Sequence, residues 1–172
     1  MAEEQLVNRV AASGLKTLKL ETFYPEWETV ELDLKDYLFK GMILREKDFR
    51  EAMKNYTWEA LAGKDLLVFC STDAIIPMWA YMLVTAHATP FAHAVYQVRP
   101  QEYLREAFLR RLADFDGAAY AGERVIVKGC SDRPVPAAAF TELTRRLRPY
   151  ARTIMYGEPC STVPIYKAPK KK

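Results

Sequence analysis

Hydrophobic and polar residues alternate in two short stretches of the N-terminal third, residues 18–21 and 30–35. Period-two alternation is typical of strands that keep one face toward solvent. Residues 24–27 lie between them, contain a proline and suit a turn, so we predict an antiparallel hairpin. Helical spacing follows over residues 46–55, and Gly63 is expected to end a second, short helix.

From Lys64 onward, apolar runs alternate with helical patterns. Strands are predicted over residues 66–70, 92–98, 124–128 and 152–156, and helices over residues 73–88, 100–113 and from Pro136 onward. The order β-α-β-α-β-α-β implies parallel strands joined by right-handed crossovers. We therefore expect a single α/β domain over residues 1–172, with a mixed, mostly parallel sheet and an N-terminal antiparallel hairpin. Within it, residues 1–63 hold the hairpin and short helices, residues 64–160 form the βαβ part, and residues 165–172 form a flexible basic tail.

Composition fits this picture. The 172 residues are 50% hydrophobic and 27% charged, which suits a globular domain large enough to fold without a disulfide or metal. The chain begins without the basic and apolar regions of a signal peptide, and its longest apolar run is too short to cross a bilayer. We therefore expect a cytoplasmic protein that does not bind membranes.

The basic residues do not favour nucleic acid as a partner. The net charge is only +3, and the arginines of the helices predicted over 100–113 and after Pro136 are interspersed with glutamates. We interpret them as a solvated surface.

The three cysteines share a local pattern. Cys70, Cys130 and Cys160 are each followed by a serine, namely Ser71, Ser131 and Ser161, although the whole chain has only four serines. Each cysteine also lies at or just beyond the end of a predicted strand. If the strands are parallel and share one sheet, the three thiols lie at its carboxyl edge, where open α/β sheets bind ligands.

Thiolates at such an edge are metal ligands. Three of them hold zinc with a fourth ligand, or an iron–sulfur cluster with one open iron. The predicted topology places His87 and His93 at the opposite edge, so the fourth ligand is expected to be a carboxylate, water or substrate. The carboxylates near the cysteines, which also qualify as general acids or bases, are Asp73, Asp132 and Glu158. We expect the N–H groups and hydroxyls of the serines to donate hydrogen bonds to a cysteine sulfur or to a bound anion.

Two other hypotheses remain open at this point. Buried cysteines often only pack, and the protein is then an interaction module that binds a partner through aromatic residues near the hairpin or through the basic helices. Alternatively, one cysteine of low pKa makes the protein a thiol enzyme.

Four longer segments resemble an uncharacterised bacterial family, a domain of unknown function. They contain the strings LREKDFR, CSTDAIIP with WAYML, KGCSDRPVP and GEPCSTVP, over residues 44–50, 70–83, 128–136 and 157–164. The resemblance covers nearly the whole chain but implies no established activity, cofactor or catalytic residue. The association of such genes with sulfur-mobilisation-type iron–sulfur assembly implies iron–sulfur assembly proteins as partners and favours a cluster over zinc.

Overall fold

The computed structural model describes residues 14–129, 132–158 and 161–169. The chain divides into two compact units, which we name by their place in the sequence. The terminal unit comprises Met1–Tyr24 and Ala107–Lys172, and the middle unit comprises Pro25–Glu106. Helix α3 (Pro100–Ala113) contributes residues to both.

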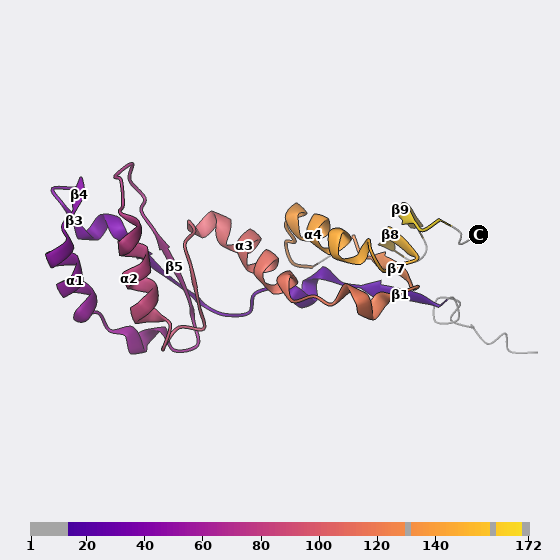
Figure 1. Ribbon diagram of the computed structural model, residues 1–172, viewed down its shortest axis with the longest axis horizontal. Helices are drawn as coiled ribbons and strands as arrows, with labels where there is room; N and C mark the ends of the chain where they lie inside the picture. Colours follow the sequence, from indigo (N-terminus) through magenta and orange to yellow (C-terminus); the bar gives the residue numbers. More distant parts are fainter. Residues whose placement is uncertain (1–13, 130–131, 159–160, 170–172) are drawn as a thin grey trace, which may run out of the picture. The chain divides into compact units, whose positions relative to one another are not determined.

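A three-stranded, fully parallel sheet forms the centre of the middle unit, with the strand order β2-β5-β6. Its strands are β2 (Thr29–Asp33), β5 (Asp65–Phe69) and β6 (Ala94–Tyr96). Helices α1 (Glu46–Lys54) and α2 (Met78–Ala88) lie side by side in this unit (Figure 1). The short strands β3 (Leu38–Phe39) and β4 (Ile43–Leu44) pair antiparallel, and two 3-10 helices are η3 (Leu34–Tyr37) and η4 (Trp58–Leu61).

The core of the middle unit follows from the hydrophobic pattern. Every residue of the central strand β5 is buried, as its continuous apolar run predicts. Side chains from both helices pack against this strand in one cluster that includes Phe49, Met53, Leu66, Ala80 and Val84. This packing fixes the carboxyl end of β5, where Cys70 follows.

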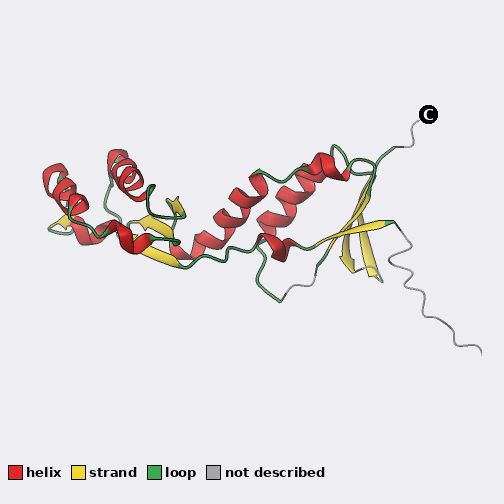
Figure 2. Ribbon diagram, turned by 90° about the horizontal axis from the view of Figure 1, so that it is seen from below, coloured by secondary structure: helices red, strands yellow, loops and turns green. Residues whose placement is uncertain are grey.

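A four-stranded sheet with the order β1-β7-β8-β9 forms the terminal unit. Strands β1 (Leu15–Leu18), β7 (Arg124–Val127) and β8 (Thr153–Glu158) are parallel, and β9 (Ser161–Lys167) runs antiparallel to β8. Figure 2 shows these strands, in yellow, twisted against one another, as sheets of L-residues are. The unit also contains α4 (Ala137–Leu147) and the 3-10 helices η2 (Leu20–Phe23) and η5 (Gly117–Tyr120).

The α/β class, with mostly parallel strands and an antiparallel hairpin in the N-terminal third, is confirmed. The hairpin is formed, however, by β3 and β4 and not by the two alternating segments. Those segments contribute to β1 and β2, which lie in different sheets and pair in parallel with β7 and β5. Only Leu18 of the first segment lies in a strand, because residues 20–23 form the 3-10 helix η2, whereas residues 30–33 of the second segment lie in β2. Alternation also carries no information about the partner strand.

Two boundaries also differ from the prediction. Helix α2 begins at Met78 because Pro77 is extended, with ψ 139°, and a proline disfavours helical geometry in the residue before it. Strand β9 reaches Lys167, so residues 165–167 of the expected basic tail belong to the sheet. Among the described residues, no helix is long and apolar enough to cross a membrane.

Candidate functional site

The three cysteines do not follow strands of one sheet. Cys70 follows β5 of the middle unit, whereas Cys130 and Cys160 follow β7 and β8 of the terminal unit. The prediction of one edge of one sheet is therefore wrong, because the strands are divided between two sheets. Cys130 and Cys160 themselves, and Ser131, lie outside the described residues.

Cys70 is a free thiol, 9% exposed, at the carboxyl end of the central strand. Its Sγ lies 3.2 Å from Thr72 Oγ1, and Arg99 Nη2 donates to its carbonyl oxygen at 3.4 Å. A pocket of about 400 Å³ opens beside it, lined also by Tyr81 and Gln97. The thiol therefore lies beside a cavity with a phenol, an amide and a guanidinium on its walls.

The electrostatics of this pocket involve Tyr81. Burial raises the pKa of Tyr81, the nearby Cys70 raises it further, and a hydrogen bond with the Gln97 side chain opposes the shift. The phenol is thus kept protonated beside the sulfur, where it can donate a hydrogen bond or act as a general acid.

Ser71 is engaged by Asp33 rather than by the cysteine sulfur. The Ser71 N–H donates to Asp33 Oδ1 at 3.0 Å, and Lys35 contributes its own N–H and an ion pair at 3.2 Å. Burial raises the pKa of Asp33, but the hydrogen bonds from Ser71 and Lys35 outweigh it and lower the pKa to about 2. Asp73 is exposed and lines a separate pocket with residues of the β3–β4 turn, so it does not line the Cys70 cavity.

A second arrangement lies at the carboxyl edge of the terminal sheet. Lys128, just after β7, places Nζ 3.4 Å from Oε2 of Glu158, the last residue of β8. The other carboxylate oxygen, Glu158 Oε1, is buried and has no hydrogen-bond partner among the residues the structure describes. Ser161 is exposed at the start of β9, opposite Glu158, and Asp132 is also exposed.

Glycines bring the backbone close together at this edge. Gly157 has φ +120°, and a Cβ there would lie 2.5 Å from the carbonyl oxygen of Ser161. A Cβ on Gly129 would lie 2.6 Å from the ring and hydroxyl of Tyr156. Gly157 therefore requires glycine, because both its φ and the neighbouring backbone exclude a side chain, whereas at Gly129 the added atom meets only the end of the Tyr156 side chain.

Within the middle unit, the two histidines lie away from Cys70, which follows the carboxyl end of β5. His87 is in the last turn of α2 and stacks on Trp58. His93 precedes β6 at the amino edge of the middle sheet, where its Nδ1 lies 2.7 Å from Oδ1 of Asp65.

The pairing of Asp65 with His93 and Tyr103 was not predicted from the sequence. Asp65 is only 1% exposed, and its second oxygen accepts from the Tyr103 hydroxyl at 2.6 Å. The Trp27 ring stacks on the His93 imidazole, with 4.2 Å between the centroids. The only available signal was a carboxylate at the start of a fully buried strand, because buried charges are normally paired.

Within the described parts of the chain, no three His, Cys, Asp or Glu side chains form a group suited to hold a metal ion. A family model described as "Protein of unknown function (DUF2480)" matches residues 4–168. The chain belongs to this family. Membership in DUF2480 confirms the resemblance to an uncharacterised family and carries no activity with it. Neither the search of curated proteins nor the search of solved structures found a match.

Proposed function

We propose that this protein binds a metal ion or iron–sulfur cluster through the thiolates of Cys130 and Cys160. The observation that supports the proposal is the contact between Lys128 and Glu158, 3.4 Å apart. In the sequence, Cys130 comes two positions after Lys128 and Cys160 two positions after Glu158. The two cysteines therefore follow the carboxyl ends of neighbouring parallel strands, β7 and β8. Two thiols supplied from adjacent strands are a common basis for zinc and iron–sulfur ligation.

The residues around this edge suit such a group. The unpartnered Oε1 of Glu158 supplies a carboxylate oxygen, which would be a third ligand for zinc beside the two thiolates and would leave the fourth position open. The Lys128 ammonium lies at the same sheet edge as Glu158, and a cation there would favour the deprotonated form of a thiol that reached it. In this proposal Ser131 and Ser161, which directly follow the two cysteines in the sequence, would supply hydrogen-bond donors to the sulfurs.

A site with only two protein thiolates leaves positions for an exchangeable ligand. This favours a protein that receives or passes on a cluster, with iron–sulfur assembly proteins as the proposed partners and the reducing cytoplasm as the proposed compartment. In that role the cluster is cargo, and Asp132 or Glu158 is the proposed proton donor or acceptor during exchange.

The test is anaerobic purification after co-expression with an iron–sulfur assembly system, followed by iron, sulfide and zinc analysis and a visible spectrum. We expect a brown protein, or a colourless one with about one zinc per chain, that loses its metal in Cys130→Ser and in Cys160→Ser. The matched control is Cys70→Ser, which belongs to the other unit and is expected to retain the metal. A metal-free wild-type protein, or loss of metal in the Cys70 variant alone, contradicts the proposal.

A second candidate function, thiol chemistry at Cys70, is supported by its cavity with Tyr81 and Arg99 on the walls. In this proposal the Cys70 thiolate attacks a small electrophile, and Tyr81 hydrogen-bonds to the leaving group or developing anion. Mass spectrometry of iodoacetamide-treated protein measures the reaction, in which a sulfur–carbon bond forms and iodide leaves. We expect alkylation of Cys70 to slow in Arg99→Ala while the fold is retained. Equal rates in wild type and variant contradict it.

A further inference from the structure

The terminal unit contains an apolar pocket between α4 and strands β8 and β9. Its volume is about 470 Å³, within the range of small-molecule sites. The walls are largely hydrocarbon and aromatic, with side chains from the helix and from both strands, including Phe140, Ile154, Tyr156 and Ile165. None of its lining residues is a Cys, His, Asp or Glu, so the chemistry of the pocket differs from that of the proposed metal site.

Large apolar side chains remain in contact with solvent here. Tyr156 is 42% exposed and Ile165 is 52% exposed, although both belong to strands of the sheet. Ile154 pairs with Tyr166 and Met155 with Pro164, so Ile165 is the extra residue of a β-bulge. Bulges redirect side chains, and this one leaves Ile165 on the wall of the pocket instead of in the regular ladder.

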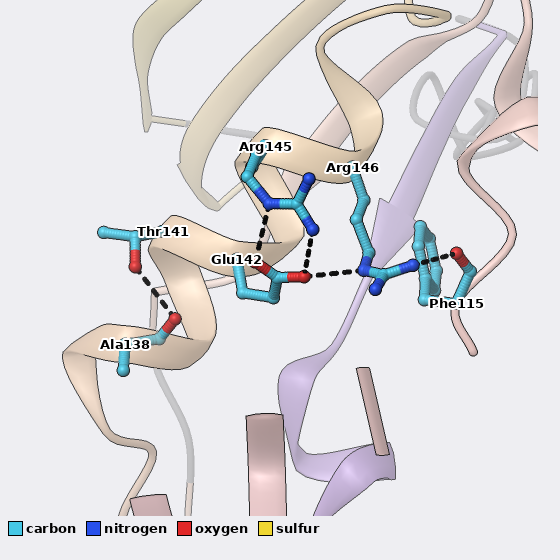
Figure 3. Close-up of polar contacts among 6 residues, drawn as sticks. All are labelled: Phe115, Ala138, Thr141, Glu142, Arg145 and Arg146. Atoms are coloured by element: carbon cyan, nitrogen blue, oxygen red, sulfur yellow. Dashed lines mark hydrogen bonds and ion pairs between the residues drawn. The ribbon is translucent and has the colours of Figure 1, made fainter. Parts of the chain in front are cut away.

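Arg145 and Arg148 make one side of the pocket basic. Figure 3 shows the polar network on α4 that holds the Arg145 side chain. Arg145 donates to both oxygens of Glu142, at 2.8 and 2.7 Å, and Arg146 donates to the same carboxylate at 2.7 Å. The Arg145 hydrogen bonds, followed by those of Arg146, lower the pKa of Glu142 to about 2. One carboxylate therefore serves two guanidinium groups, and the cluster keeps a positive charge.

Arg148 adds a further positive charge to the wall. Its guanidinium stacks on the Tyr166 ring, 3.6 Å from the centroid. Over the residues described by the structure, Arg148 forms no ion pair with a carboxylate. A guanidinium that stacks through its face can still donate hydrogen bonds from the N–H groups at its edge. Two such N–H groups match the two oxygens of a carboxylate.

We propose that this pocket binds a free medium-chain carboxylate, with its hydrocarbon chain in the apolar pocket and its carboxylate on Arg148, beside Arg145. The apolar walls account for the chain and the uncompensated guanidinium accounts for the head group. An uncharged apolar ligand leaves the arginine side unused, and a small anion leaves the hydrocarbon walls unused. The proposal is independent of the metal site.

The experiment is a titration of the full chain with decanoate, followed by NMR chemical shifts of the terminal unit or by calorimetry. Decanol and acetate are the two comparison ligands, since each keeps one half of the proposed chemistry. We expect decanoate to bind at least tenfold more tightly than decanol, and acetate to show no saturable binding.

Two variants locate the site. Arg148→Ala is expected to weaken decanoate binding about tenfold, and Thr144→Phe, which fills the pocket from α4, is expected to abolish it. Arg105→Ala, an exposed arginine of the middle unit, is the matched control and is expected to bind like wild type. Equal affinity for decanol, unchanged binding in both variants, or no binding of decanoate to folded wild type overturns the proposal. Self-association that Thr144→Phe abolishes, without decanoate binding, assigns the pocket to a second copy instead.

Discussion

The carboxylate of Asp33, at the end of β2, accepts a hydrogen bond of 3.0 Å from the backbone N–H of Ser71. The two residues are 38 positions apart in the sequence, and their contact joins the carboxyl ends of two neighbouring parallel strands. Because Ser71 follows Cys70 directly, this bond also positions the backbone at the thiol. Asp33 is therefore a positioning residue for the Cys70 pocket.

The Asp33 contact predicts a pH-dependent contribution to stability. Its folded-state pKa of about 2 lies below the ordinary value of 3.8, a difference that corresponds to about 2 kcal/mol. A lowered pKa means that this stability is present in full above about pH 4 and disappears as the pH falls through about 2. We expect Asp33→Asn to lower the free energy of unfolding by about 2 kcal/mol at pH 6 and by much less near pH 2.

Urea unfolding of wild type and variant between pH 6 and pH 2 measures this difference. The matched control is Asp36→Asn, an exposed carboxylate three residues along the chain, which is expected to change little at any pH. A difference between wild type and Asp33→Asn that is constant across this range shows that Asp33 is not held in its ionised form.

Replacement of Asp65 removes the shared acceptor of His93 and Tyr103. We expect Asp65→Ala to lower the free energy of unfolding by about 3 kcal/mol, because two polar side chains lose a buried partner. Asp65→Asn, which still accepts hydrogen bonds, is expected to cost less. Denaturant unfolding followed by tryptophan fluorescence measures the cost, and one of the three tryptophans, Trp27, stacks on His93. A cost of Asp65→Ala no larger than that of the exposed variant Glu51→Ala contradicts the role.

Gly117 packs against the backbone of α4 in the terminal unit. A Cβ there would lie 2.2 Å from the carbonyl oxygen of Arg146. Because that oxygen belongs to the backbone, the backbone itself would have to shift to remove the clash. We expect Gly117→Ala to destabilise the protein by about 3 kcal/mol. Gly122→Ala is the control, because Gly122 has φ +75° with no atom within 4 Å, and we expect about 1 kcal/mol from backbone strain alone. Similar midpoints for the two variants in thermal unfolding are the contrary result.

Gly129 limits the position of the Tyr156 ring. In Gly129→Ala the new methyl group meets the Tyr156 ring at 2.6 Å, so the ring must rotate away. Because that ring packs edge-on against Phe140 on the wall of the apolar pocket, we expect shifted aromatic NMR signals from Tyr156 and Phe140. Unchanged signals from both rings contradict the close packing of Gly129.

Local patterns predicted individual elements well. Helix α3 begins and ends at the expected residues, and β5 is fully buried as its apolar run indicates. These elements are encoded in periodicities of a few residues, which a single segment carries. Strand β9 was not predicted from the sequence. All but one of its residues are exposed, so it shows neither alternation nor an apolar run, and it contains Pro164, which is unusual within a strand.

The three Cys-Ser pairs and their positions after strands were evident in the amino-acid order, but their separation into two sheets was not. Strand pairing is a non-local choice that depends on the total packing of each unit, and the pattern of one strand does not name its neighbour. The same reason hid the contacts of Asp33 with Ser71 and of Asp65 with His93 and Tyr103, which join residues 28 to 38 positions apart. Sequence therefore established the elements and the candidate thiols, whereas folding established which of their side chains meet.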